Sequence, residues 1–342
     1  MTARQVTIED VARSAGVSRQ TVSNALNAPH RLRATTLARV TAAIDELGYQ
    51  PDQSARSLRT GTRKVIGYPA PADNPADPNP LMSGFLQALV TAADAVGHRI
   101  LVFRSDPRQG SGAVAKSFNG LIAARQVDGF VLSDVVHDDP RVDVLTEAGF
   151  PFAAFGRTAP GRPQNWVDID STAATAALVG LLLDQGHRRI CYINSAASLP
   201  WLADRRAGFL RAAAAAPDGA FEVSVPDDEP AALSHAVRRL LTGPDRPTAL
   251  VCASDWLALT AYQAVRAAGL TIGGDVAVTG FNDMPLCTLL QPSLTSARLP
   301  LAAIARVLVD QLITTVEDSA AAPTSGLLLP AEPVVRGSTP GR

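Results

Sequence analysis

The sequence predicts an α/β protein with a small all-α N-terminal head and a larger body of parallel sheets in two lobes. Two short amphipathic helices joined by a glycine turn are predicted within residues 7–27. Beyond residue 64, apolar runs alternate with amphipathic helices in two successive series. Apolar strands that each precede a helix are typical of parallel sheets covered on both faces. We therefore expect the head at 1–50, a connector at 51–63 and the body at 64–342.

The first predicted helix of the head begins after Thr7. The Thr7 hydroxyl can cap this helix together with Asp10, three residues later. Gly16 ends the helix, because glycine adopts the left-handed turn conformation without strain. The apolar stripe of the helix consists of Ile8, Val11, Ala12 and Ala15.

The second predicted helix follows Ser18, which can cap it, while Val17 and Val22 can pack as a hydrophobic staple. Its apolar side is formed by Val22, Ala25 and Leu26. Its outward polar side chains are Arg19, Gln20, Ser23 and Asn24. Such side chains pair with base edges in a DNA major groove, as in the recognition helix of a helix-turn-helix. From this segment alone, an ordinary helical hairpin with a polar surface is the alternative.

A third helix, predicted over residues 35–47, completes a three-helix core, and Gly48 ends it. Its apolar face consists of Leu37, Val40, Ile44 and Leu47. Residues 1–64 contain ten Lys and Arg but five Asp and Glu, whereas the whole chain has a formal charge of −1. The remainder is therefore acidic. A basic head on an acidic body is typical of a protein that contacts DNA with one end only.

Several motifs follow one another along the chain. The head motif TIEDVARSAGVSRQTVSNALN is followed by ELGYQPDQSARSL and VIGY; the body contains DGFVLSD, PFAAFGR, GHRRI, DRRAGF, ASDWLALTAYQAVRAAGL and VAVTGFNDMPL, then PSLTSARLP. In this order, over nearly the whole chain, they resemble the lactose-repressor (LacI/GalR) family. The resemblance implies a body like that of periplasmic sugar-binding proteins, with a ligand at the carboxyl ends of the strands.

The same resemblance implies how the body is divided. The N-lobe is expected at about 64–158 and 291–318, and the C-lobe at about 159–290 and 319–342. The chain is expected to cross between the lobes near 157–168, 282–295 and 318–326.

The function implied by the resemblance is that of a DNA-binding transcriptional regulator, a repressor controlled by a small molecule. The expected partners are a palindromic double-stranded DNA operator, a sugar effector and a second copy of the chain, without a cofactor or a membrane. The side chains expected to contact DNA are Thr7, Ser18, Arg19, Gln20, Thr21, Ser23, Asn24, Asn27, Arg31, Ala55 and Leu58.

The connector contains a segment, residues 52–59, that can form one or two helical turns but is too short to be stable alone. Ala55 and Leu58 lie three residues apart and so share a face. The resemblance implies that two such segments of a dimer fold together in the minor groove, where Leu58 wedges between base steps. The alternative is that Leu58 packs on the back of the head.

The effector is expected to contact planar polar side chains and an aromatic face, since these groups recognise sugar hydroxyls and C–H surfaces. Arg205 begins the R-x-x-G-F pattern within DRRAGF, and Trp256 follows a strand at its carboxyl end. Trp201 can instead simply cover a helix start, and Asp168 can be a hydrogen-bonding residue at a lobe crossing. The expected effector-binding residues are Arg157, Trp166, Asp168, Arg205, Asp255, Trp256, Asn282 and Asp283.

One position departs from the family pattern. The family usually has G-[FY]-D where this chain has Gly280, Phe281 and Asn282, with Asp283 next. A carboxylate only accepts hydrogen bonds, whereas an amide both donates and accepts. The hydroxyl pattern that this chain recognises is therefore expected to differ from that of common relatives.

Other classes of protein are disfavoured by the sequence. A free solute-binding protein would carry a signal peptide and no basic head, but MTARQVTIED has no apolar segment, and a cytoplasmic location is expected. An enzyme is disfavoured because the chain lacks a P-loop, a dinucleotide fingerprint and a nucleophile elbow. No apolar run is long enough for a membrane span. The cysteines, expected to be buried free thiols, are Cys191, Cys252 and Cys287.

Overall fold

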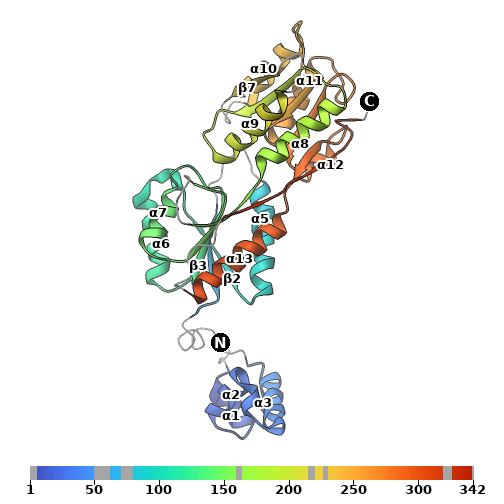
Figure 1. Ribbon diagram of the computed structural model, residues 1–342. Helices are drawn as coiled ribbons and strands as arrows, with labels where there is room; N and C mark the ends of the chain where they lie inside the picture. The colour runs from blue at the N-terminus through green and yellow to red at the C-terminus, as the bar shows by residue number, and fades with distance from the viewer. Residues whose placement is uncertain are drawn as a thin grey trace, which may run out of the picture. The chain divides into compact units, whose positions relative to one another are not determined.

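The computed structural model describes residues 6–49, 62–70, 80–158, 164–214, 220–225, 230–318 and 326–340. The chain forms two compact units, Met1–Arg63 and Lys64–Arg342, which correspond to the head and the body (Figure 1). The predicted connector helix, with Ala55 and Leu58, lies outside the described residues.

The head is a three-helix domain, as predicted. Its elements are α1 (Ile8–Ser14), α2 (Arg19–Asn27), the short 3-10 helix η1 (Pro29–Arg31) and α3 (Ala34–Leu47). Its buried core consists of Val11, Ala12, Ala15, Val22, Val40 and Ala43. Because this core comes from all three long helices, it fixes the orientation of α2 within the head.

The ends of the head helices follow local sequence signals. The Thr7 hydroxyl accepts the Asp10 backbone N–H at 3.3 Å, and the Asp10 carboxylate accepts the Thr7 N–H at 3.0 Å. Gly16 and Gly48 both adopt a φ of 61° directly after helical segments. These predicted boundaries are confirmed, and they set the tight turn that precedes α2.

The first lobe of the body is built on a six-stranded sheet with the order β11-β5-β4-β3-β1-β2. All its strand pairs are parallel. Helices α5 and α13 pack side by side (Figure 1), and α6 packs against α7. The elements are β1 (Val65–Ala70), α5 (Pro80–Ala95), β2 (Arg99–Arg104), η2 (Pro107–Gln109), α6 (Ser111–Ala123), β3 (Gly129–Leu132), α7 (Pro140–Glu147), β4 (Phe152–Phe155), β5 (Asn165–Ile169), α13 (Leu301–Glu317) and β11 (Leu327–Leu329).

The second lobe has a sheet with the order β12-β10-β9-β8-β6-β7, in which only the β10–β12 pair is antiparallel among the described strands. Helices α8 and α9 pack together, as do α10 and α11. The elements are α8 (Ser171–Asp184), β6 (Ile190–Ser195), α9 (Pro200–Ala213), β7 (Ala220–Val225), α10 (Pro230–Leu241), β8 (Ala249–Cys252), α11 (Asp255–Ala267), β9 (Ala277–Asn282), α12 (Leu286–Leu289), β10 (Thr295–Arg298) and β12 (Glu332–Val334).

The crossings between the lobes differ from their predicted positions. Strands β5 and β11 belong to the first sheet, and β10 belongs to the second. The chain therefore crosses after β5, after β10 and after β11, each time beyond the segment that the sequence suggested. The reason is that NWVDI pairs with β4, TSAR with β9 and LLL with β5 before the chain changes lobes. The boundaries expected near 158, 290 and 318 are corrected accordingly.

The three cysteines are buried and free, as predicted. Burial raises the pKa of the Cys191 thiol to about 12, and it also raises the pKa of Cys252 and of Cys287. Thiols of this kind are chemically inert in the folded protein, because the thiolate is the reactive form.

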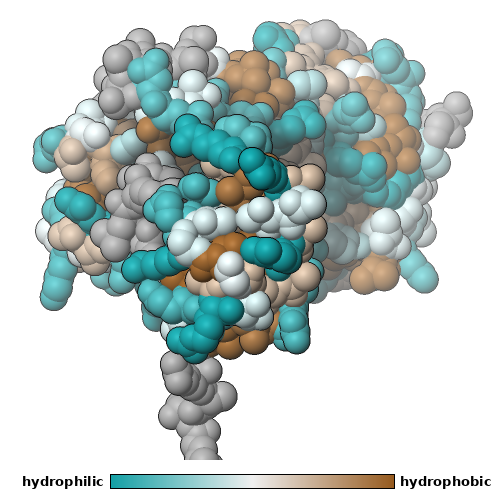
Figure 2. All heavy atoms as spheres, turned by 90° about the horizontal axis from the view of Figure 1, so that it is seen from below, coloured by the Kyte–Doolittle hydropathy of each residue, from teal (hydrophilic) through white to brown (hydrophobic). Residues whose placement is uncertain are grey.

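The surface is mixed in character. The face drawn in Figure 2 is covered largely by hydrophilic residues, with separate hydrophobic patches between them. Within the part of the chain that the structure describes, no helix has the length and apolarity that a membrane crossing requires.

Candidate DNA-binding face and effector site

The exposed face of α2 carries two amides that are one helical turn apart. Gln20 donates from Nε2 to the Asn24 Oδ1 at 3.1 Å. At the start of the helix, the Ser18 hydroxyl accepts the Thr21 backbone N–H at 3.1 Å, and the two hydroxyls lie 2.9 Å apart. The cap therefore fixes the first turn, and the amide pair restricts the side chains that follow it.

The other expected DNA contacts lie around this face. Arg19 is exposed and lies 3.4 Å from the Glu9 carboxylate, a surface pair that a phosphate can replace at little cost. Arg31 is exposed on η1, Ser23 is half-buried on α2, and Thr7 belongs to the cap of α1. The side chain of Asn27 lies outside the description of the structure.

Arg205 lies on α9 and is 4% exposed. Its Nη1 donates to the Ala253 carbonyl at 2.5 Å, and its Nη2 donates to the Asn282 Oδ1 at 3.1 Å. The guanidinium carbon lies 3.6 Å from the Phe281 ring centroid and 4.4 Å from that of Trp201. Burial lowers the pKa of Arg205 to about 10, so the group remains charged at neutral pH.

One atom of this arginine stands out. Among the described residues, the buried Nε of Arg205 has no hydrogen-bond partner. An unsatisfied buried donor costs about 1–3 kcal/mol, and more when it belongs to a charged group. A ligand oxygen at this position would remove that cost.

Arg157 follows β4 and joins the two lobes. Its Nε donates to the Asp168 Oδ2 at 2.9 Å, and its Nη2 pairs with the carboxylate of Asp204 on α9. Desolvation is the largest effect on Asp204 and raises the pKa of this carboxyl, although Arg157 acts in the opposite direction. The guanidinium also lies 5.3 Å from the Trp166 ring centroid.

Trp166, on β5, contacts more than Arg157. A Cβ atom at Gly326 would lie 1.6 Å from its ring, so the indole lies directly against the backbone there. Only glycine fits beside the ring at this distance. Trp256, the second residue of α11, is half-buried and is not joined to the Arg157 or Arg205 groups by any contact that the structure records.

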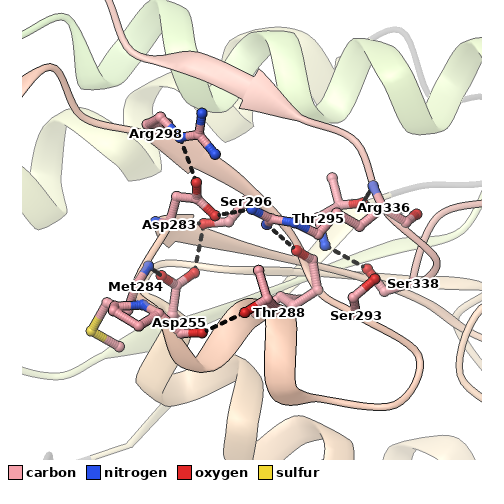
Figure 3. A network of polar contacts seen from close by, with 12 residues as sticks. Asp255, Asp283, Met284, Thr288, Ser293, Thr295, Ser296, Arg298, Arg336 and Ser338 are labelled. Atoms are coloured by element: carbon pink, nitrogen blue, oxygen red, sulfur yellow. Dashed lines mark hydrogen bonds and ion pairs between the residues drawn. The ribbon is translucent and has the colours of Figure 1, made fainter.

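Asp255 is fully buried at the start of α11, and its carboxylate is engaged by other parts of the second lobe (Figure 3). It accepts the Ser296 hydroxyl at 2.6 Å and the Met284 backbone N–H at 2.8 Å. A Cβ at Gly280 would lie 2.2 Å from its Oδ1, so this close approach requires glycine. Desolvation raises the pKa of Asp255 to about 6.

Asp283 is engaged in the same network (Figure 3). Its carboxylate pairs with Arg298 and with Arg336, each at 2.6 Å, and its backbone N–H donates to the Ser296 hydroxyl at 3.0 Å. Asn282 and Asp283 have φ angles of 113° and 54°, both unusual for residues other than glycine. The network thus holds a strained turn that presents the Asn282 amide to Arg205.

The expected effector residues therefore fall into groups. Arg157, Trp166 and Asp168 come together, and Arg205 meets Asn282, while Asp255 and Asp283 form the network behind them. Sequence reasoning did not select Asp204, Phe281 or the Ala253 carbonyl. The signal for Asp204 was its place directly before Arg205 in DRRAGF, at the start of a helix.

Comparison with known proteins gives consistent matches over the whole chain. The model for bacterial regulatory proteins of the lacI family matches residues 7–52, and the model for a periplasmic binding protein-like domain matches residues 179–339. The transcriptional regulator AglR of Rhizobium meliloti is 33% identical over 98% of this chain and 94% of its own length. The regulator CelR of Thermobifida fusca is 31% identical over 90% of this chain and 92% of its own length.

Solved structures show the same similarity. The lac repressor dimer bound to operator and the anti-inducer ONPF superposes with a TM-score of 0.80 at 26% identity, covering 98% of this chain and 99% of that one. A complex of the transcriptional regulator CelR with cellobiose superposes with a TM-score of 0.68 at 27% identity, covering 98% of this chain and 100% of that one. The chain thus consists of a helix-turn-helix head and two parallel-sheet lobes, like the lac repressor.

Proposed function

The chain belongs to the LacI family of bacterial regulatory proteins, and we propose that it is a repressor whose operator binding is controlled by a sugar held between its two lobes. Members of this family are DNA-binding transcriptional regulators and not enzymes. The body is the effector-binding part, and a sugar is supported by the cellobiose complex of the regulator CelR.

The DNA-reading element is α2. Arg19 suits guanine, and Gln20 and Asn24 suit adenine, because each offers a bidentate pairing to a base edge in the major groove. The exposed position of Gln20 and the hydrogen bond that aligns it with Asn24 support this role. Thr7, Ser18, Thr21, Ser23 and Arg31 lie around this face and position the head on the phosphates. Asn27 is proposed as a further contact from its place in the sequence, at the end of α2.

The effector site is centred on Arg205, and the unpartnered Nε is the observation that supports it best. The guanidinium lies on the ring of Phe281, which is buried in the core and holds it in place, and near the Asn282 amide. The half-buried Trp201 beside it offers apolar surface for a sugar ring. Arg157, Trp166 and Asp168 form the side of the site that belongs to the first lobe. Asp255 and Asp283 support it through the network around Ser296. Trp256 is proposed as a further contact only because it follows strand β8 at its carboxyl end.

The functional unit is a homodimer on a palindromic operator. One head reads too few base pairs for adequate specificity, so two-fold symmetry is required. The first lobe exposes apolar side chains that a second copy can cover: Val90 on α5, Val96 just after it and Val102 on the edge strand β2 are 48%, 39% and 50% exposed. The related lac repressor was solved as a dimer on its operator.

Control of DNA binding follows from the geometry of such a dimer. Closing the lobes of each body rotates the first lobes relative to each other, and these carry the connectors. Two connectors held apart cannot pair in one minor groove, so the heads lose their fixed spacing. The effector shifts operator affinity only by its differential affinity for the two states, typically about 1–3 kcal/mol.

A gel-shift assay on the DNA upstream of the protein's own gene tests this function. The full chain should shift that DNA and a chain without residues 1–61 should not. A body that binds sugars, with a full chain that shifts no DNA, would instead identify a solute-binding protein. A thermal-shift screen of mono- and disaccharides identifies the effector, since a ligand at a hundred times its Kd stabilises the body by about 2.7 kcal/mol.

The variant Arg205→Ala tests whether Arg205 binds the effector. It should abolish the effect of that sugar on the gel shift while leaving operator affinity intact, because Arg205 lies in the body and not in the head. A variant with a normal response to the sugar would remove Arg205 from the effector site.

A further inference from the structure

We propose that Asp204 determines the charge of the ligand: its carboxylate makes the site select uncharged saccharides and reject anionic ones such as sugar phosphates and uronates. The inference rests on the proposed function, because it concerns the ligand of the same site. It starts from a contact between the lobes, in which Asp204 of α9 pairs with Arg157 of the β4–β5 connection.

The position of Asp204 is fixed by the packing of α8 and α9. Its backbone carbonyl accepts the Thr172 hydroxyl at 3.0 Å. One turn further along α9, a Cβ at Gly208 would lie 2.2 Å from the Thr172 carbonyl, so the two helices approach each other as closely as glycine allows. The Asp204 side chain is 32% exposed, so its charge acts on a ligand that reaches Arg157.

The charges of the site balance. Arg157 and Arg205 are opposed by Asp168 and Asp204, of which Asp168 is 10% exposed at its side chain. The other carboxylates nearby, those of Asp170, Asp255 and Asp283, do not make the site more attractive to an anion. Asp170 caps α8 and adds negative potential. Asp255 belongs to the network in which Asp283 pairs with both Arg298 and Arg336 (Figure 3).

The distribution of this charge is uneven. Arg157 already has two carboxylates, whereas the hydrogen bonds of Arg205 go to neutral oxygens, the Ala253 carbonyl and the Asn282 amide. Arg205 alone would therefore attract an anion. Arg157, Asp168 and Asp204 together carry one net negative charge, and Asp204 directly precedes Arg205 in the chain. Asp204 thus supplies the charge that offsets Arg205 and opposes an anionic ligand.

An uncharged saccharide fits this arrangement. A saccharide carries several hydroxyls, each both donor and acceptor. One of them can accept from the free Nε of Arg205, and another can donate to the Asp168 or Asp204 carboxylate, both of which act electrostatically on Arg205. A phosphate or carboxylate group would satisfy Nε but would accept only. It would also face the Asp204 and Asp168 carboxylates with like charge, at a partly buried position where screening is weak.

Asp204→Asn in the full chain tests the proposal, with inorganic phosphate as the probe and tryptophan fluorescence as the readout. Trp201 lies beside Arg205 and Trp166 beside Arg157, so occupancy of the site changes their emission. The wild type should show no saturable response. The variant should show a saturable response, with an affinity for phosphate at least about tenfold above the highest affinity that the wild-type titration would allow. Removing one unit charge a few ångströms away has an effect of this size at partial burial. Adding Arg205→Gln to the variant should abolish the response.

The matched control is Glu222→Gln, which removes one carboxylate from the same lobe. Glu222 pairs with Arg206 and not with Arg157 or Arg205. This variant should behave like the wild type towards phosphate. A saturable, Arg205-dependent response in the wild type would overturn the proposal, and so would an Asp204→Asn variant without a response or a control that gains one. The assay needs neither DNA nor a sugar, so its failure is distinct from failure of the proposed regulatory function.

Discussion

At the scale of single residues, the amide pair of α2 shows how a surface is prepared for recognition. Gln20 and Asn24 hydrogen-bond to each other on the face of α2 that points away from the core of the head. Their mutual bond reduces the number of side-chain conformations that binding must freeze. On binding, each amide can exchange its hydrogen bond to the other amide for hydrogen bonds to a base edge.

Gln20→Ala should therefore change sequence preference. We expect a loss of about 1–3 kcal/mol at one base position of the operator, with a relaxed preference there. Binding to a set of operators that differ at single positions measures this effect. The matched control is Glu46→Ala, an exposed head residue on α3. Equal weakening on all sequences would identify Gln20 as a phosphate contact.

Asp255 gives the body a dependence on pH. Its pKa in the folded protein is raised from 3.8 to about 6 by burial, so the folded state binds its proton more tightly than the unfolded chain does. The stability from this group is fully present below pH 3.8 and is lost as the pH rises through about 6. The loss amounts to about 3 kcal/mol, from the size of the pKa shift.

Urea unfolding of the wild type and of Asp255→Asn between pH 4 and 8 measures this loss, with the difference between the two proteins as the quantity of interest. The wild type should lose stability relative to the variant mainly between about pH 4 and 6, where the unfolded chain has released the proton and the folded carboxyl still holds it. A constant difference over this range would show that Asp255 keeps an ordinary pKa.

At the scale of elements, we expect specific DNA affinity to depend on the connector, through the proposed wedge at Leu58. Leu58→Ala should weaken specific operator binding by about tenfold or more, because an apolar wedge between base steps is lost. Sugar affinity measured without DNA should stay the same. Fluorescence anisotropy with labelled operator measures the DNA affinity, and calorimetry measures the sugar affinity. Normal operator affinity would mean that Leu58 packs on the head.

Elements with local signals were predictable from the sequence, and others were not. Thr7, Ser18, Gly16 and Gly48 mark helix ends by capping or by a positive φ, and these properties depend on near neighbours only. Helix α8 carries no amphipathic signal, because STAATAALVGLLLD is apolar around most of its circumference and has no clear stripe. The short strands β5, β7, β10, β11 and β12 have no strong local signal either, since strand pairing depends on distant segments.

The site was predictable in the same uneven way. Arg205 and Asn282 were found because a motif placed them, and the structure brings them within hydrogen-bond distance. Asp255 and Asp283 carry the same carboxyl group as Asp204, and sequence alone does not show which carboxylate faces a ligand. That distinction depends on distant segments of the chain: Ser296 and Arg298 in β10, Met284 between β9 and α12, and Arg336 after β12.

At the scale of the whole molecule, the expected dimer depends on the exposed edge of the first lobe. Val102→Asp places a carboxylate on β2, where a second copy would otherwise cover an apolar side chain. We expect monomers in sedimentation velocity and weaker operator binding, with unchanged sugar affinity. Val335→Asp is the matched control, because Val335 is 54% exposed on the second lobe. A Val102→Asp dimer would place the interface elsewhere.

The assignment of β11 and β12 to different sheets has a consequence for synthesis of the protein. These are the last strands in chain order, and they form the outer edges of the first and the second sheet. Neither lobe is encoded by a continuous stretch of the gene. A ribosome that has made everything up to α13 has therefore produced two unfinished sheets, and we expect both lobes to complete their folding together, after β12 has been released.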